Sequence, residues 1–154
     1  MLLHHVAISV QDIEKSLVFY RDALGLTVFQ DEVISGLDVD TGLMEKYARV
    51  RMVLLMDEAG NMIELLDWQS PTVRERPYEH RNFTSTGLVE VCFMVPDLQK
   101  VEKDLLRNGF SFRTPVWPFG KDTGTYGGGY AAIRYAEDPN GVNVEFIQVV
   151  EAAK

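Results

Sequence analysis

Apolar residues recur along the start of the chain first at strand spacing and then at helical spacing. His5–Val10 is a short, largely apolar run of strand length, and Asp12 follows it closely. Asp is a favoured N-cap because its carboxylate accepts hydrogen bonds from the free backbone donors of the first helical turn. Gly25, where the helical spacing stops, suits a left-handed C-cap. A helix is therefore predicted between them, with these apolar residues on one face: Ile13, Leu17, Tyr20 and Leu24.

The pattern repeats in the second half of the chain. Residues 90–97 match residues 5–12 as a second strand that ends in Asp, and the helix that follows stops at Gly109. Its apolar face consists of Leu98, Val101 and Leu105. After each helix a further short strand is expected, at 26–29 and at 110–113.

A predicted β-hairpin closes each copy. In the first copy, strands 49–56 and 62–66 flank a turn at 57–61, and in the second, strands 131–136 and 142–149 flank a turn at 137–141. The second turn contains Asp138-Pro139-Asn140-Gly141, in which Pro presets one dihedral angle and Asn-Gly tolerates positive φ. The sequence thus predicts an α+β fold of two βαβββ modules that form a pseudo-twofold, curved mixed sheet with a central cavity.

The boundaries follow from this duplication. We predict a single domain over residues 1–154, with module one at about 1–68, a polar linker at about 69–86 and module two at about 87–150. Residues 33–47 and 114–130 are two long connections inside the modules. Long loops in compact domains are often lids or binding loops.

Composition excludes several classes of protein. The 154 residues are 46% hydrophobic and 25% charged, which is typical of a globular domain. A net charge of −8 argues against a nucleic-acid partner, because such binding depends on clustered Lys and Arg. No apolar run approaches the roughly 20 residues of a membrane span. Cys92 is the single cysteine, so no internal disulfide is possible, and a cytoplasmic location is expected.

Four polar residues interrupt the apolar strands at equivalent places in the two copies. His5 and Glu90 lie on the first strands, and Glu64 and Glu145 lie on the last. A duplicated fold brings equivalent positions together around its approximate twofold axis. Imidazole nitrogen and carboxylate oxygens are suitable ligands for Mn, Ni, Co, Zn or Fe ions, whereas carboxylates gathered without a cation would repel one another. We therefore expect a divalent metal ion there.

The chain resembles the vicinal oxygen chelate superfamily, which includes glyoxalase I, methylmalonyl-CoA epimerase, bleomycin and fosfomycin resistance proteins and extradiol dioxygenases. The resemblance covers nearly the whole chain and implies His5, Glu64, Glu90 and Glu145 at the four metal positions and, because many relatives dimerise, a homodimer. The following motifs carry it: Leu3-His4-His5-Val6-Ala7-Ile8-Ser9-Val10, Ser16-Leu17-Val18-Phe19-Tyr20-Arg21-Asp22-Ala23-Leu24-Gly25-Leu26, Ile63-Glu64-Leu65-Leu66 and Asp138-Pro139-Asn140-Gly141-Val142-Asn143-Val144-Glu145.

Three departures from the resembled enzymes bear on the reaction. They usually have His or Gln at the start of the second module, where this chain has Glu90, so the ligand set is harder and more anionic. The epimerase branch is implied to carry a carboxylate base on the third strand of module one, but residues 49–53 contain no acid. One His with three Glu also departs from the two His and one carboxylate typical of Fe(II) oxygenases.

Other candidate residues have both a functional and a structural interpretation. Arg51 and Arg134, on corresponding third strands, either clamp a substrate carboxylate or form solvated or structural ion pairs. Glu64 and Glu145 point either into the cavity or to water. His4 should face the opposite side of its strand from His5. The second loop offers aromatic side chains that either line a substrate pocket or pack under the loop: Trp117, Phe119, Tyr126 and Tyr130.

The leading hypothesis is a metal-dependent lyase or isomerase that acts on a small carbonyl, 2-hydroxy acid or thioester substrate. The cation would bind two neighbouring substrate oxygens and stabilise an enediolate-like anion, with Glu145 or Glu90 as the catalytic base. One alternative is a metal-free protein that binds a ligand or confers drug resistance. The other alternative is an extradiol-type dioxygenase.

Overall fold

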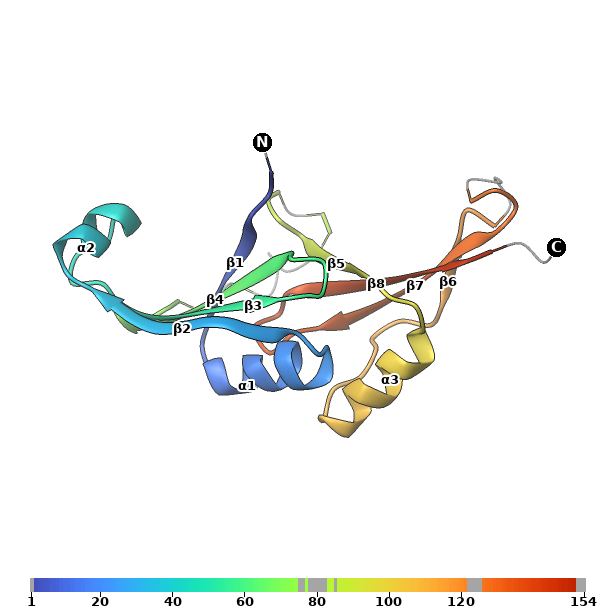
Figure 1. Cartoon of the computed structure of the whole chain (residues 1–154), viewed down its shortest axis with the longest axis horizontal. Helices are drawn as coiled ribbons and strands as arrows, with labels where there is room; N and C mark the ends of the chain where they lie inside the picture. The colour runs from blue at the N-terminus through green and yellow to red at the C-terminus, as the bar shows by residue number, and fades with distance from the viewer. Residues whose placement is uncertain (1, 75–76, 78–82, 85, 122–125, 152–154) are drawn as a thin grey trace. The chain divides into compact units, whose positions relative to one another are not determined.

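A computed structural model describes residues 2–74, 77, 83–84, 86–121 and 126–151 (Figure 1). The predicted linker and the second long loop therefore lie partly outside the described residues. The chain divides into two compact units, Met1–Arg76 and Pro77–Lys154, referred to below as module one and module two. In the described part of the chain, no helix combines the length and apolar character that crossing a membrane requires.

Module one is a four-stranded mixed sheet with the strand order β1-β4-β3-β2. The first strand runs parallel to the last, and the remaining neighbours are antiparallel. The strands are β1 (His5–Val10), β2 (Thr27–Ser35), β3 (Arg49–Met56) and β4 (Met62–Ser70). The helices are α1 (Ile13–Leu17), its π-helical continuation η1 (Val18–Ala23) and α2 (Leu37–Leu43).

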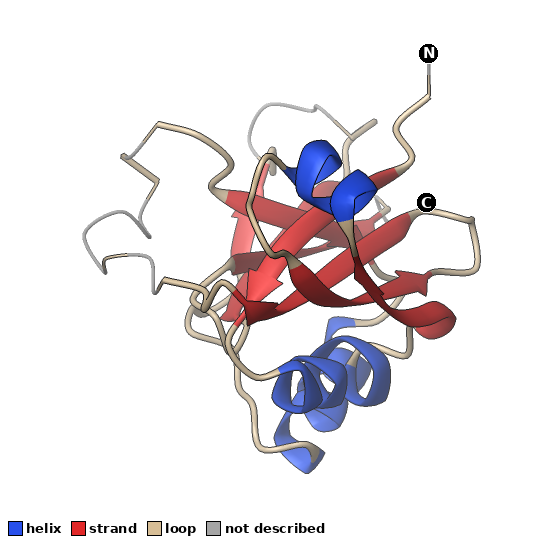
Figure 2. Cartoon of the chain, turned by 90° about the vertical axis from the view of Figure 1, so that its left-hand side faces the viewer, coloured by secondary structure: helices blue, strands red, loops and turns tan. Residues whose placement is uncertain are grey.

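Module two repeats this topology with the strand order β5-β8-β7-β6. Its first and last strands are again parallel, and the other pairs are antiparallel. Its elements are β5 (Glu90–Met94), α3 (Leu98–Arg107), β6 (Trp117–Phe119), β7 (Tyr130–Glu137) and β8 (Asn143–Val150). The predicted α+β fold of two equivalent modules is thus confirmed, and both views show strands flanked by helices (Figures 1 and 2).

The predicted helix caps are also present. The Asp12 carboxylate accepts a hydrogen bond from the backbone N–H of Lys15, and Asp97 does the same for α3. Gly25 has φ 80° and Gly109 has φ 83°, so both helices are followed by a left-handed residue. The local signals at the ends of the helices were therefore sufficient to place them.

The second strand of each module differs from the prediction. The predicted strand 26–29 extends through the whole of β2, which pairs with β3 as far as Ser35, and α2 follows it in the predicted loop. At 110–113 the structure has only an isolated bridge, Phe112 to Ala136, and β6 takes the fourth place in the sheet. Both β2 and β6 are edge strands, which do not require an apolar pattern because one side of the strand faces solvent.

Alternation along β4 and β8 separates the core from the prospective site. Ile63 and Leu65 are buried on the face of β4 that lies against α1, so Glu64, between them, points to the opposite face. Val144 and Phe146 are likewise buried in β8 beside α3 and flank Glu145. The apolar packing of each helix therefore orients the acid on the neighbouring strand.

Two glycines without neighbouring atoms at the Cβ position test how much the helix end contributes to stability. Gly109→Ala should lower the free energy of unfolding by about 1 kcal/mol, because a left-handed residue with a Cβ costs roughly 1–2 kcal/mol. Gly42→Ala, within α2 and without positive φ, should raise it by about 0.5–1 kcal/mol. Chemical denaturation of both variants is the measurement. Equal effects of the two substitutions would contradict the left-handed conformation of Gly109.

Candidate metal centre

The first pair of candidate ligands lies on the parallel strands of module one. Ala7 is opposite Glu64 in the register, which places His5 diagonally next to that acid on the same face. His5 Nε2 lies 3.4 Å from Glu64 Oε2, and the side chains are 36% and 12% exposed. An imidazole nitrogen and a carboxylate oxygen therefore face one another on the side of the sheet that α1 does not cover.

Module two places its acids at the same register positions. Cys92 is opposite Glu145, just as Ala7 is opposite Glu64, and Glu90 takes the place of His5. Glu145 is 7% exposed, and its Oε1 accepts a hydrogen bond of 2.9 Å from the Tyr135 hydroxyl. The structure therefore gives this carboxylate a fixed orientation.

Glu90 is the least satisfied of the four groups. Its Oε2 is buried and has no hydrogen-bond partner among the described residues. Burial raises the pKa of Glu90, and the negative charge of Glu145 raises it further. A buried acceptor without a partner is costly, and a bound proton or a cation would remove that cost.

Two residues around Glu145 were not among the predicted site residues. Burial, a hydrogen bond to Glu145 and the charges of Glu145 and Glu90 raise the pKa of Cys92 to about 12. The same causes raise the pKa of the Tyr135 hydroxyl. Both groups therefore stay protonated at neutral pH and act as hydrogen-bond donors to the carboxylate rather than as nucleophiles.

His4 was expected to face away from His5, and this expectation is wrong. His4 precedes β1, so strand alternation does not govern its direction, and its Nδ1 lies 2.8 Å from Nδ1 of His5. A hydrogen bond at Nδ1 leaves Nε2 of His5 directed at Glu64. Metal-binding histidines commonly use their second ring nitrogen for such an orienting hydrogen bond.

The four groups form two pairs of donors that suit a hard or borderline divalent cation. Within each module, the described residues bring together two of the predicted ligands and contain no group of three or more that could hold a metal ion. The unpartnered Oε2 of Glu90 and the facing His5 and Glu64 are the observations that fit a cation. Both modules thus contain potential ligands at the same strand positions.

Arg51 and Arg134 have acidic partners on the helix-covered faces. Arg51 donates to both carboxylate oxygens of Asp31, at 2.9 and 2.8 Å, and to Glu14 of α1 at 2.7 Å. Arg134 donates to Glu102 of α3 at 2.9 Å and lies over the ring of Phe112. The geometry therefore favours the structural interpretation of both arginines.

The register supports this conclusion. Arg51 pairs with Asp67, which lies on the other face of β4 from Glu64. Arg134 pairs with Phe146, which lies on the other face of β8 from Glu145. Both arginines therefore lie on the faces of their sheets opposite to Glu64 and Glu145, and a substrate-binding role for them stays a prediction.

The predicted aromatic pocket in the second loop is only partly assembled. Trp117 and Phe119 are 52% and 42% exposed and contact each other edge-to-face with ring centroids 5.2 Å apart. Tyr130 lies under the Lys121 ammonium, and Tyr126 forms an isolated bridge with Gly129. Residues 122–125 of this loop lie outside the described part of the chain. A substrate-binding role for these aromatics stays a prediction.

Comparisons with known proteins agree with the duplicated fold. A family model described as the Glyoxalase/Bleomycin resistance protein/Dioxygenase superfamily matches residues 2–146. No curated protein sequence matches the chain.

Solved structures with this fold include proteins of different kinds, all at low sequence identity. A glyoxalase family protein from Bacillus cereus is 17% identical with a TM-score of 0.82, over 98% of this chain and 97% of that chain. A glyoxalase I mutant from Zea mays is 15% identical with a TM-score of 0.63, over 97% of this chain and 46% of that chain. TnmS3, an antibiotic binding protein from Streptomyces sp. CB03234, is 15% identical with a TM-score of 0.60, over 97% of each chain. These similarities show the fold alone.

The raised pKa of Glu90 predicts a pH-dependent effect of its substitution. Between the unfolded and the folded pKa the native protein binds more protons than the unfolded chain, so this group reduces stability as the pH rises through that interval. In metal-free protein, Glu90→Gln should therefore raise the melting temperature at pH 7.5, with the gain shrinking as the pH falls towards 4. Thermal unfolding across this range is the measurement. Asp22→Asn, which removes an exposed carboxylate that pairs with Arg21, is the control. A gain at pH 4 equal to that at pH 7.5 would contradict the stated cause.

Proposed function

Because the chain belongs to the Glyoxalase/Bleomycin resistance protein/Dioxygenase superfamily, we propose that it is a metal-dependent lyase or isomerase of a small carbonyl, 2-hydroxy acid or thioester substrate. The observation that carries this proposal is the matched placement of one ligand pair in each module, His5 with Glu64 and Glu90 with Glu145. Members of this superfamily commonly bind a divalent metal ion and small molecules.

The proposed metal ligands are His5, Glu64, Glu90 and Glu145. Their one nitrogen and three carboxylate donors suit Mn, Fe, Co, Ni or Zn ions better than soft cations such as Cu(I). The bound ion would supply Lewis acidity to two neighbouring oxygens of the substrate. His4 and Tyr135 would orient His5 and Glu145, since each forms a hydrogen bond with the ligand side chain.

Glu90 is our candidate for the group that accepts a proton from the substrate. Its Oε2 has no partner among the described residues, whereas Glu145 is held by Tyr135 and Cys92. Burial also raises the pKa of Glu90, which makes the carboxylate a stronger proton acceptor. Of the two bases proposed from the sequence, Glu90 is thus the one whose Oε2 no described residue holds, and it would act as the base once loosened from the metal ion as the substrate binds.

The second candidate function is a metal-free protein that sequesters a small ligand. Support comes from Glu90, an acid at a position where the resembled enzymes usually have His or Gln, and from the similarity in fold to the antibiotic binding protein TnmS3. An extradiol dioxygenase is third, because the donor set contains a single histidine. A homodimer and a cytoplasmic location stay predictions.

Metal binding separates the two leading candidates. Protein stripped with EDTA should bind Mn²⁺ or Co²⁺ in calorimetry, and His5→Ala and Glu145→Gln should each weaken the affinity by about tenfold or more. Glu14→Gln and Glu102→Gln are matched controls, because these acids pair with arginines on the helix-covered faces. Bound cation should also raise the melting temperature in proportion to its affinity.

The outcomes point in different directions. Affinity that is lost in the two ligand variants and kept in the controls supports the metal-dependent enzyme. Stoichiometric binding that survives both His5→Ala and Glu145→Gln would refute the proposed ligands. No binding of Mn²⁺, Co²⁺, Ni²⁺ or Zn²⁺ by the wild-type protein would favour the metal-free binder.

A further inference from the structure

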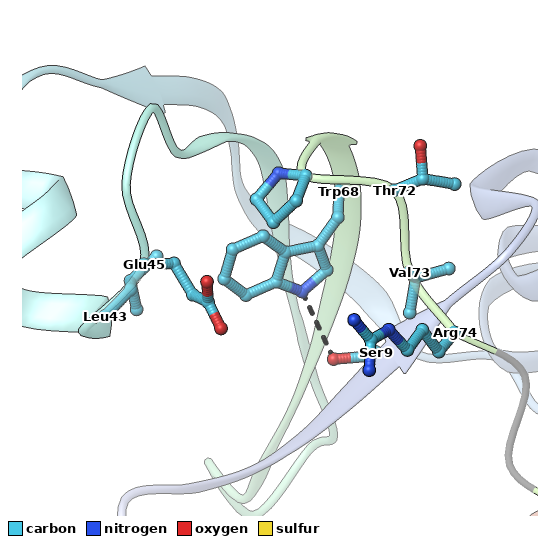
Figure 3. A pocket seen from close by; sticks show the side chains of 8 residues that line it. Ser9, Leu43, Glu45, Trp68, Thr72, Val73 and Arg74 are labelled. Carbon is cyan, nitrogen blue, oxygen red and sulfur yellow. Dashed lines mark hydrogen bonds between the residues drawn. The ribbon is translucent and has the colours of Figure 1, made fainter.

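Module one contains a pocket that the sequence did not reveal. It is an open pocket with a volume of about 500 Å³, within the range of roughly 300–1,000 Å³ typical of small-molecule sites. Ser9 of β1 and Trp68 of β4 lie on one side of it (Figure 3). The other lining residues come from the end of α2, the residues just after it and the segment that follows β4. The lining residues are Ser9, Leu43, Glu45, Trp68, Pro71, Thr72, Val73 and Arg74.

The pocket opens on the same face of the sheet as the candidate ligands of module one. Ser9 lies four residues after His5 on β1, and Trp68 lies four residues after Glu64 on β4. Side chains an even number of positions apart on a strand point to the same side. A ligand bound here would therefore lie on the side of the sheet that carries His5 and Glu64.

The tryptophan offers an oriented aromatic surface. The indole Nε1 of Trp68 donates a hydrogen bond of 3.2 Å to the Ser9 hydroxyl, which fixes the ring across the two parallel strands (Figure 3). Trp68 is partly exposed. An aromatic ring stacked on an indole gains attraction beyond that of an aliphatic group of similar size.

Two opposite charges flank this surface. In Figure 3 the Arg74 guanidinium lies on the Ser9 side of the indole, and the Glu45 carboxylate lies on the other side. Both line the pocket, and in the described segments neither charged group has an ion pair or a side-chain hydrogen bond. A free guanidinium recognises carboxylates through its planar set of donors, and a free carboxylate accepts from hydroxyl or amino groups.

We propose that this pocket binds a planar aromatic acid that carries a hydrogen-bond donor at the end of the ring opposite its carboxylate. The ring stacks on Trp68, the carboxylate of the ligand binds Arg74, and the donor binds Glu45. A ligand of this kind would present one group to each of Trp68, Arg74 and Glu45, whereas a simple anion would satisfy Arg74 alone. Binding here requires no metal ion, so it is independent of the proposed function.

The probe for this proposal is 4-hydroxybenzoate, added to EDTA-treated, ¹⁵N-labelled full-length protein. The chain has two tryptophans and hence two indole N–H signals, which Trp68→Phe assigns. The Trp68 signal should shift in a saturable manner, while the Trp117 signal stays in place. Benzoate lacks the donor, phenol lacks the acid and trans-4-hydroxycyclohexanecarboxylate lacks the ring, so each should bind more weakly than the probe.

Variants identify the groups that recognise the probe. Arg74→Gln and Glu45→Gln should each weaken binding by about tenfold, as expected for the loss of a charge-assisted hydrogen bond. Arg21→Gln and Glu58→Gln are control changes at an exposed arginine and an exposed acid of module one that do not line the pocket, and they should leave the affinity unchanged. Circular dichroism of every variant confirms that it folds.

Several results would overturn the proposal. One is that the Trp68 signal does not shift at millimolar concentrations of 4-hydroxybenzoate, and another is that only the Trp117 signal shifts. A third is that the probe and the ring-free analogue bind equally well. Affinity unchanged by both Arg74→Gln and Glu45→Gln would also overturn it. Because all samples contain EDTA, failure here would leave the metal proposal untouched, and failure to bind a cation would leave this proposal untouched.

Discussion

The parallel pairing of the first strand with the last strand in each module is the constraint on which the candidate centre depends. β1 pairs with β4 and β5 pairs with β8, although two further strands and one or more helices separate them along the chain. This pairing sets His5 beside Glu64, and the equivalent pairing sets Glu90 on the strand next to Glu145. Helix packing fixes the direction of the acids, because the residues on either side of each are buried against α1 or α3.

Electrostatics then distinguishes the two modules. In module one an imidazole faces a carboxylate, so a bound proton or a cation can be shared between them. In module two, two carboxylates lie close enough for Glu145 to raise the pKa of Glu90, and Tyr135 and Cys92 donate to Glu145 alone. Glu145 therefore accepts from hydrogen-bond donors, while one oxygen of Glu90 has no partner within the described part of the chain. This asymmetry is the physical basis for assigning the two acids different roles.

Much of this arrangement could be predicted from the sequence, because the signals are local. The turn at 57–61 is symmetric about Ala59, which already places Leu54 opposite Glu64, as observed. Alternation in that register also predicts that Arg51 lies on the other face. In the second hairpin, a turn at 137–141 is symmetric about Pro139 and would place Ile133 opposite Glu145, whereas Tyr135 is the observed partner. The register of that hairpin is displaced towards the C-terminus, so Tyr135 could not be found in the same way. The pocket around Trp68 could not be predicted, because α2 and the residues after β4 show no apolar period that would place them.

X-ray absorption spectroscopy of the Zn²⁺-loaded protein tests the central claim most directly, since it reports the atoms bound to the ion. The account predicts nitrogen and oxygen donors only, with the scattering pattern of a single imidazole that disappears in His5→Ala. The chain contains three histidines and one cysteine, so other ligand sets are chemically possible. A sulfur donor, or an imidazole signal that persists in His5→Ala, would contradict the account.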